Sequence, residues 1–345
     1  MTVHAFSSYS PEAGSTRVRL YDWFRHLGLT AERHTFIGQR DARGSTLVRN
    51  LPNVFSAEVR LRRADVRGST VIMSREASPL SSGRVERRLL RDAGHSVYDF
   101  DDALFHDLSA VRRYLGQHGK CQSLVSAADV VIAGNDYLAE WASAFSSNVT
   151  MVPSCVEPDD YLQKSSWETA ERPVIVWLGS PSTEQFVADI AGPLRTVHEM
   201  TGARLRLVSG ASDNPALGSI NHMIDRIPWS PTSFAPALAS SDIAIGPLTD
   251  TPFARGKCAY KLLQYAAAAL PMVAAPVGAN ALALQRFDGL SASTPSDWTE
   301  ALTELLSEPS SGRKRRGDAA RDAVERYYAF SAWSREWASA LGLRL

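Results

Sequence analysis

The chain has 345 residues, 44% of them hydrophobic, and its 37 lysine and arginine residues balance its 37 aspartate and glutamate residues. This length is sufficient for two domains that each have a core. The formal net charge of +0 excludes a global electrostatic attraction to nucleic acid or to an anionic membrane surface. No apolar run reaches the roughly 18 residues that a membrane span needs, and Met1 leads into VHAF instead of a charged and then apolar leader. We therefore expect a soluble, cytoplasmic protein with no nucleic-acid partner and no stable membrane insertion.

The three cysteines, Cys121, Cys155 and Cys258, are widely spaced and include no CxxC motif. This pattern favours neither a disulfide framework nor a zinc ribbon, and we predict no metal site. Cys258 lies in a cationic segment that could lower the pKa of its thiol, but cysteine is more often a small buried side chain. We assign Cys258 no catalytic role.

The N-terminal half of the chain alternates between strand-like and helix-like segments. A first strand, VHAFSS, leads into a glycine-containing loop, YSPEAGS, and then into TRVRLYDWFRHLG, whose apolar residues recur at helical spacing. A second strand is expected to begin near Ala31. Strands that alternate with helices predict a parallel sheet covered on both faces. The further strands expected are residues 69–74, 95–100, 129–134 and 149–153, and the further helices are residues 84–93 and 136–145.

The C-terminal half repeats this rhythm after a polar stretch, DDYLQKSSWETAERP, which suits a linker between two domains. The fold class predicted is α/β, with two Rossmann-like domains that face each other across a cleft. We expect the domains to be residues 1–165 and 166–329, and a last helix to begin at about Asp318 and to break at Ser331. The strands expected here are PVIVWLGS, RLRLVSG (204–210), a strand within INHMIDRIPW (220–229), DIAIGPL (242–248) and PMVAAPV (271–277).

The segment from Ser241 to Asn280 combines a strand, a cationic loop, an apolar helix and a second strand. It carries Arg255, Lys257 and Lys261 where the loop is expected to become the helix. Cations oppose the positive end of a helix dipole, so this placement is unfavourable unless an anion binds there. A bound diphosphate would offset that cost, and a solvated charged surface is the alternative explanation.

A second candidate for phosphate binding is the sequence GSPST, which follows a strand and precedes a helix expected at residues 184–197. Its backbone amides and hydroxyls could hold a phosphate. Alternatively, Ser182 or Thr183 only caps the helix. Two later strand ends carry Ser209 and Trp229, and the indole ring of Trp229 would either contact a nucleobase or serve for packing.

In the N-terminal domain, candidate ligand residues also lie at strand ends. The carboxylates of Asp99, Asp101 and Asp102 crowd the end of the strand at residues 95–100, and His106 follows closely. So dense a group of charges is costly unless it is solvated or functional. Asp102 is the first choice for a contact with an acceptor. The other candidates are Asp101 and His106, Arg75 with Glu76, and the loop residues Gly14, Ser15 and Thr16.

Several of these stretches resemble one known family. DIAIGPLTDTPFARGKCAYKLLQYAAAALPMVAAPVGAN resembles the nucleotide-sugar-binding signature of GT-B glycosyltransferases, in particular the retaining family 4 enzymes. VIVWLGSPST, VYDFDDALF, ADVVIAGNDYLAEWA with VTMVPSCVEPDDY, and DAVERYYAFSAW are similar to other stretches of that family, in the family's order. The resemblance covers most of the chain. It implies an N-terminal acceptor-binding domain, a C-terminal donor-binding domain, and a C-terminal helix, residues 330–345, that packs back on the N-terminal domain.

The resemblance also implies which residues hold the donor. Many family members have an Arg directly after the glycine of GSPST and a Lys several residues later, where this chain has Ser180 and Gln185. We therefore expect Arg255 and Lys257 to contact the diphosphate, with Arg favoured for bidentate binding. The expected donor-binding residues are Gly179, Ser180, Ser182, Thr183, Ser209, Trp229, Arg255, Gly256, Lys257, Lys261 and Gln264.

A further departure affects an acidic pair of the family, two Glu residues that contact the donor sugar and the ribose. Gln264 stands at the second of these positions and Gly256 at the first. A glutamine can still hydrogen-bond a ribose diol, though more weakly than a carboxylate does. The contacts to the sugar hydroxyls are therefore left open.

The function predicted is a metal-independent, retaining glycosyltransferase that moves a sugar from a nucleoside diphosphate sugar to a small soluble hydroxyl or amine acceptor, as in natural-product biosynthesis. The nucleotide sugar is a co-substrate, and no cofactor is expected. Arg255 and Lys257 would stabilise the leaving diphosphate, and Asp102 would contact the acceptor. The alternatives are a pseudo-glycosyltransferase that couples a nucleotide-activated cyclitol to an amine, and a catalytically silent nucleotide-sugar-binding protein. A dehydrogenase is disfavoured because no GxGxxG follows the first strand.

Overall fold

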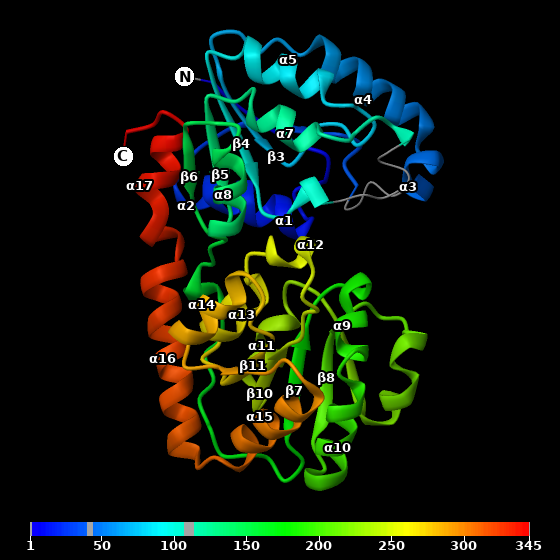
Figure 1. The fold of residues 1–345 in the computed structure, drawn as a ribbon, viewed down its shortest axis with the longest axis vertical. Coiled ribbons are helices and arrows are strands. Elements are labelled where there is room, and N and C mark those ends of the chain that lie inside the picture. Colours follow the sequence, from blue (N-terminus) through cyan, green and yellow to red (C-terminus); the bar gives the residue numbers. More distant parts are fainter. Residues whose placement is uncertain (1, 40–43, 107–113, 345) are drawn as a thin grey trace. The chain divides into compact units, whose positions relative to one another are not determined.

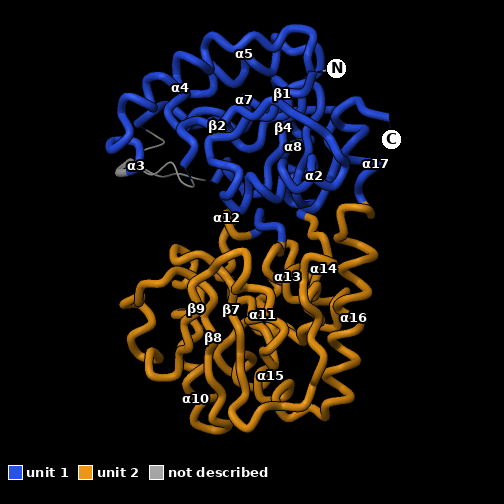
Figure 2. Tube along the Cα trace, turned by 180° about the vertical axis from the view of Figure 1, so that it is seen from behind, with its two compact units in different colours: residues 1–154, 255–258, 333–345 blue, residues 155–254, 259–332 orange. Residues whose placement is uncertain are grey.

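The computed structural model describes residues 2–39, 44–106 and 114–344. The chain forms two compact units (Figure 2). Unit 1 comprises residues 1–154, 255–258 and 333–345, and unit 2 comprises residues 155–254 and 259–332. These bounds differ from the expected division at residue 165, and they assign residues 255–258 of the cationic segment to unit 1. The cause is local packing, because the backbone of these residues contacts loops at the strand ends of unit 1.

Unit 1 is built on a parallel sheet, and its six described strands follow the order β2-β1-β3-β4-β5-β6 (Figure 1). Every residue of the first and third strands is buried, as expected where helices cover both faces of a parallel sheet. The strand order reverses between β1 and β3, and ligands of such sheets bind beyond the carboxyl ends of the strands at that point. The strands are β1 (Val3–Ser7), β2 (Glu32–Thr35), β3 (Thr70–Ser74), β4 (His95–Phe100), β5 (Val130–Ala133) and β6 (Val149–Met151).

The first helical segment of unit 1 differs from the one expected. Gly14, Ser15 and Thr16, predicted in a loop, form its first turn, α1 (Gly14–Thr16), and a π-helical turn, η1 (Arg17–Tyr21), follows before α2 (Asp22–His26). The other helices in the described part of unit 1 are α3 (Gly44–Arg49), α4 (Leu51–Arg63), α5 (Arg84–Asp92), η2 (Leu104–His106), α7 (Lys120–Val125), α8 (Asp136–Ser143) and most of α17 (Phe330–Ala340).

Unit 2 contains a second parallel sheet, with its six described strands in the order β12-β11-β10-β7-β8-β9. Side chains along its first strand alternate between two cores, Ile175 and Trp177 in one and Val176 and Leu178 in the other. Helices therefore cover both faces. The strands are β7 (Val174–Leu178), β8 (Arg204–Ser209), β9 (Ile224–Pro228), β10 (Ile243–Gly246), β11 (Met272–Ala274) and β12 (Leu290–Ser291).

The helices of unit 2 include α10 and α15, which pack together (Figure 1), and α13, which packs against α16. The last long helix begins at Ser310, earlier than expected, and breaks at Ala329 instead of Ser331, because the backbone of Ala329 is extended and bridges to Val156. The helices are η3 (Pro158–Asp160), η4 (Pro181–Thr183), α9 (Gln185–Ala188), α10 (Ala191–Thr201), η5 (Pro215–Met223), α11 (Phe234–Ala239), α12 (Pro252–Arg255), α13 (Tyr260–Ala267), α14 (Ala279–Arg286), α15 (Pro295–Ser307) and α16 (Ser310–Tyr328).

Every strand expected from the sequence is present, and the prediction of two α/β units with parallel sheets is confirmed. Within the three described ranges of the chain, no helix is both long enough and apolar enough to cross a membrane.

Candidate functional site

The loop of residues 179–183 follows β7 at the point where the strand order of unit 2 reverses, and we call it the Gly179 loop. A Cβ atom at position 179 would lie 2.3 Å from Cη2 of Trp177 and 3.0 Å from Cε of Lys261, so only glycine fits. The Nζ atom of Lys261 lies 5.6 Å from the centroid of the Trp177 ring, a cation–π distance. The structure thus brings together two of the predicted donor residues, Gly179 and Lys261.

The hydroxyls of the Gly179 loop form a small cluster. The Oγ atom of Ser180 lies 3.0 Å from Oγ of Ser182 and 3.4 Å from Oγ1 of Thr183, and the Thr183 hydroxyl donates to the Ser180 carbonyl over 3.0 Å. The helix expected at residues 184–197 is divided into α9 and α10. The N-cap residue of α9 is Glu184, and its side chain makes no cap hydrogen bond. The Thr183 hydroxyl is thus engaged within the loop, whereas at least one of the neighbouring Ser180 and Ser182 hydroxyls is left to donate to a phosphate.

The ends of β8 and β9 pack beside the Gly179 loop. The backbone N–H of Trp229 donates to the Ser209 carbonyl over 2.7 Å, and a Cβ atom at Gly210 would lie 2.7 Å from Cγ of Pro181. The Trp229 ring is partly buried and stacks on Phe234, with the ring centroids 6.2 Å apart and an interplanar angle of 18°. This contact gives Trp229 a packing role, and a contact with a nucleobase stays a prediction.

The segment that carries Arg255, Lys257 and Lys261 does not pass directly from a loop into one helix, as expected, but contains a separate short helix. Arg255 is the last residue of the short helix α12, and the next helix, α13, begins only at Tyr260 after Ala259, whose φ of 54° is left-handed. A cation in the last turn of a helix interacts favourably with the helix dipole, so the electrostatic cost expected for Arg255 does not arise. Of the three cations, Lys261 is the one in the first turn of α13. Gln264 lies in the middle of this helix and is buried.

A cavity of about 370 Å³ opens at the carboxyl ends of β10, β11 and β12 in unit 2. Two polar side chains in its lining, Thr249 and Asp189, are joined by a hydrogen bond of 2.8 Å. No sequence motif marks these two residues. In the sequence, Asp189 is recognisable only as a residue that follows α9, and Thr249 only as a residue of the loop after β10. These positions point to a site only once the strand order is known. The apolar part of the lining includes Phe186, Pro247, Leu248 and Trp298.

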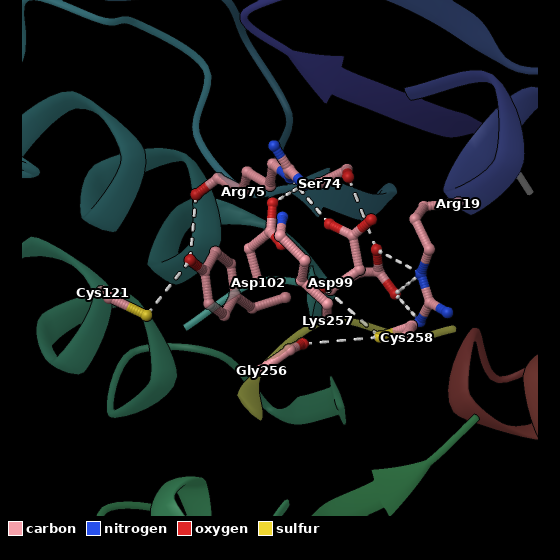
Figure 3. Close-up of polar contacts among 11 residues, drawn as sticks. Arg19, Ser74, Arg75, Asp99, Asp102, Cys121, Gly256, Lys257 and Cys258 are labelled. Carbon is pink, nitrogen blue, oxygen red and sulfur yellow. Dashed lines mark hydrogen bonds and ion pairs between the residues drawn. The ribbon is translucent and has the colours of Figure 1, made fainter. Parts of the chain in front are cut away.

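In unit 1, the predicted carboxylates join a network of cations that we call the Arg75 cluster: Arg19, Arg75, Asp99, Asp101, Asp102 and Lys257 (Figure 3). Arg19 comes from the π-helical turn η1 and points at Asp99 at the end of β4. Its Nη2 atom lies 2.5 Å from Oδ1 of Asp99, and its Nη1 atom donates to the Val152 carbonyl over 2.9 Å. Both side chains of this pair are fully buried.

Burial opposes the charge of Arg19, but the Asp99 carboxylate outweighs it and raises the pKa of Arg19 above its ordinary value. Removing one partner of a buried pair typically costs about 3–5 kcal/mol, because the other charge is left unpaired. The pair therefore serves the architecture of unit 1. The sequence pattern places Arg19 only within the expected helix TRVRLYDWFRHLG. A cation among the apolar residues of TRVRLYDWF was the available signal.

Arg75 directly follows β3 and has a φ of 63°, in the left-handed region. Its Nε atom lies 2.7 Å from Oδ1 of Asp101, and its Nη2 atom pairs with Asp102. Burial opposes the charge of Arg75, but the two carboxylates outweigh it and raise the pKa of Arg75 well above its ordinary value. Left-handed non-glycine residues cost of order 1–3 kcal/mol and cluster at functional sites. Arg75 is such a left-handed residue, and it lies at the carboxyl end of β3, where the strand order of unit 1 reverses.

Lys257 completes the Arg75 cluster, with its Nζ atom 3.3 Å from Oδ1 of Asp102. The backbone around it is held by Asn135, whose side-chain amide donates to the carbonyls of Arg255 and Lys257 over 3.3 and 3.1 Å. Asn135 also caps α8, so the same side chain ties residues 255–257 to a helix start. No sequence motif marks this asparagine.

Cys258 and Gly256 are both buried against strand-end loops of unit 1. The thiol of Cys258 lies 3.3 Å from the Asp101 carbonyl, and burial raises the pKa of Cys258. Burial thus keeps this thiol neutral. A Cβ atom at Gly256 would lie only 2.4 Å from the backbone N of Ala103, so no side chain fits there.

Two other acceptor candidates, Glu76 and His106, are not members of the Arg75 cluster. Glu76 is buried, and its Oε2 atom lies 2.8 Å from Nζ of Lys120. Its carboxylate thus belongs to a core ion pair. His106 is exposed, and its Nε2 atom lies 2.9 Å from the hydroxyl of Tyr137. Each carboxylate of the Arg75 cluster has a cationic partner, so the cluster offers hydrogen-bond acceptors for a hydroxylated ligand more readily than ligands for a cation.

Comparisons with known proteins identify the fold. No protein-family model and no curated protein matches the chain. Trehalose-6-phosphate synthase OtsA is similar to it over 100% of both chains, with a TM-score of 0.69 at 10% identity. An E. coli trehalose-6-phosphate structure bound with UDP-2-fluoro glucose matches over 100% of both chains, with a TM-score of 0.65 at 11% identity. WaaG, a glycosyltransferase involved in lipopolysaccharide biosynthesis, matches over 97% of this chain and 99% of its own, with a TM-score of 0.66 at 12% identity. The chain therefore has the α/β fold of the GT-B glycosyltransferases, as the sequence predicted.

Proposed function

We propose that this protein is a glycosyltransferase that transfers a sugar from a nucleoside diphosphate sugar to a small hydroxyl or amine acceptor. The observation that carries the proposal is the position of Lys261, whose ammonium group lies over the Trp177 ring beside the Gly179 loop. A cation, loop amides and serine hydroxyls at the strand reversal of a parallel sheet suit a diphosphate. One neighbour of the same fold is bound with UDP-2-fluoro glucose, which supports this class of donor.

In the proposed reaction, the bond from the anomeric carbon to the diphosphate oxygen breaks and a bond from that carbon to the acceptor oxygen or nitrogen forms. The acceptor proton passes to the leaving diphosphate, and the sugar keeps its anomeric configuration. No metal ion is needed, because cationic side chains stabilise the negative charge that develops on the leaving group. We assign this role to Lys261, with Arg255 and Lys257 as further cations.

The acceptor is proposed to bind at the Arg75 cluster of unit 1. Asp101 and Asp102 are held by Arg75, and Lys257 contacts Asp102 from the other side of the carboxylate. Burial would raise the pKa of Asp101, but Arg75 and Arg19 lower it below its ordinary value. The carboxylate of Asp101 therefore stays ionised and can accept hydrogen bonds from acceptor hydroxyls.

The test is a panel of nucleoside diphosphate sugars with soluble polyol and amine acceptors, monitored for nucleoside diphosphate release and for glycosylated product. A product with retained anomeric configuration supports the proposal. Tight binding of a nucleotide sugar without any product would identify a silent binding protein instead. Binding of no member of the panel would refute the donor assignment.

Lys261→Ala is expected to lower the transfer rate by about 10²-fold, because one preorganised positive charge on the leaving group is lost. A similar loss is expected for Lys257→Ala. Lys314→Ala is the matched control, since Lys314 also lies over a tryptophan, 5.1 Å from the Trp167 ring centroid, but on α16. Equal rates in the Lys261 and Lys314 variants, measured at saturating and at low donor, would contradict the diphosphate assignment.

A further inference from the structure

Three side chains with metal-ligating atoms meet on the first two strands of unit 1. His4 lies on β1, and Glu32 and His34 lie two residues apart on β2. The parallel register places His4 opposite Glu32 and Phe6 opposite His34. Since residues two apart point to the same face of a strand, the three side chains project from one face of the sheet.

The distances between their ligand atoms suit one metal ion. Nδ1 of His4 lies 3.0 Å from Nε2 of His34 and 3.3 Å from Oε2 of Glu32, and Nε2 of His34 lies 3.9 Å from that oxygen. Tetrahedral zinc with bonds of about 2.0–2.1 Å holds its ligand atoms about 3.3–3.4 Å apart. The three observed distances bracket this value, so a small adjustment of the side chains would complete the triangle.

The two imidazole rings are held in place by stacking. The His34 ring contacts two others, with its centroid 4.3 Å from that of Phe6 and 5.2 Å from that of His4. The interplanar angles are 9° and 26°. Ligands that are already ordered lose less conformational entropy when an ion binds.

An ion can reach the site and would keep room for further ligands. The side chains of His4 and His34 are 10% and 28% exposed, whereas that of Glu32 is 62% exposed. His34 also lines a cavity of about 580 Å³ together with Ser56, Arg60 and other residues of α4. Water or a small anion could occupy this space and complete the coordination.

We propose that His4, Glu32 and His34 bind one divalent transition-metal ion, with Zn²⁺ favoured. Two imidazole nitrogens and one carboxylate oxygen form a ligand set that zinc sites use, with a further position open to water. The ion would join β2, an edge strand of its sheet, to β1. The site begins at the second residue of β1, whereas the Arg75 cluster lies where β3 and β4 end, so the ion takes no part in the proposed transfer.

The experiment uses the full chain, freed of metal with a chelator and titrated with Zn²⁺ against a chromophoric competitor. Wild type is expected to bind one equivalent, and Glu32→Gln and His34→Gln are each expected to weaken binding at least tenfold. His222→Gln is the control, because His222 also belongs to a pair of neighbouring histidine rings, 5.4 Å from His198, and should bind as wild type does.

Co²⁺ provides a second readout, since four-coordinate Co²⁺ absorbs visible light far more strongly than the hydrated ion. The strong absorption should appear in wild type and in His222→Gln, and be lost in Glu32→Gln. The side chain of Glu32 is mostly exposed, so the metal-free variant should keep the circular dichroism spectrum and the melting temperature of wild type. Absence of a Zn²⁺ equivalent in wild type, or equal affinity in wild type and both site variants, would overturn the proposal.

Discussion

At the scale of single residues, close backbone approaches decide which side chain a position can carry. Gly256 occupies the place where the family resemblance implies a glutamate, and the backbone of Ala103 leaves no room there for even a Cβ atom. Gly179 has the same restriction from the Trp177 ring. The missing acidic side chain at position 256 therefore follows from the packing of this loop on unit 1.

Gly256→Ala is expected to lower the free energy of unfolding by roughly 1–3 kcal/mol, because the added methyl group overpacks a rigid backbone contact. Gly192→Ala is the matched control. A Cβ atom at Gly192, in α10, meets nothing within 4 Å, and alanine favours the helix, so stability should stay the same or rise by up to about 1 kcal/mol. Urea unfolding curves measure both. A Gly256 variant as stable as wild type would refute the steric explanation.

At the scale of elements, two helical segments of unit 1 position Arg19 and Trp337, which are among the largest fully buried side chains. The π-helical turn η1, closed by a hydrogen bond from the Asp22 N–H to the Arg17 carbonyl, carries Arg19 to Asp99. Such turns are rare and occur frequently at functional sites. The helix α17 docks through Trp337, which stacks on Trp23 with the ring centroids 5.2 Å apart. These contacts agree with the prediction that the C-terminal helix packs on the N-terminal unit.

Trp337→Ala is expected to cost about 3–5 kcal/mol of stability, because a fully buried indole ring is replaced by a cavity. Trp333→Ala, four residues earlier on the same helix and only partly buried, should cost less. Thermal unfolding of the two variants under identical conditions measures the difference. If both variants lose the same stability, the docking role of Trp337 is wrong.

At the scale of the whole molecule, charge is balanced both overall and within buried pairs. The sequence has equal numbers of acidic and basic residues, and buried carboxylates such as Asp99 and Glu184 meet arginines. In unit 2, Oε1 of Glu184 lies 2.8 Å from Nη1 of Arg226. Burial tends to raise the pKa of Glu184, but its hydrogen bonds, first of all to Arg226, lower the pKa below its ordinary value.

This shift predicts a pH dependence of stability. Because the pKa of Glu184 is lower in the folded than in the unfolded state, the unfolded state binds more protons between the two values, and stability rises with pH there. The contribution is complete above about pH 4.3, the ordinary glutamate pKa, and is lost as the pH falls through the folded value. Urea unfolding between pH 3 and 7 should show a steeper loss for wild type than for Glu184→Gln. Parallel curves for the two proteins would contradict this.

The prediction of the fold from the sequence succeeded where local patterns carry the information. Apolar runs such as VIVWL and VVIA located central strands, because a strand covered on both faces is apolar along its length. The pattern failed at α12, where a four-residue helix ending at Arg255 interrupts the cationic segment. It also failed at the start of α16, whose first turns are mostly polar and basic. Short or polar helices lack the hydrophobic periodicity on which such predictions depend.

The sequence by itself determined that the chain forms two α/β units and that glycine, hydroxyl and cationic residues gather in loops after strands. Only the tertiary structure decided which of these residues meet. Arg19 and Asp99 are 80 positions apart, and His4 and His34 are 30 apart, yet each pair is in contact. Strand order and register bring such residues together, and both depend on the packing of distant segments. Local propensities fix the elements, whereas contacts between them are set by the whole folded chain.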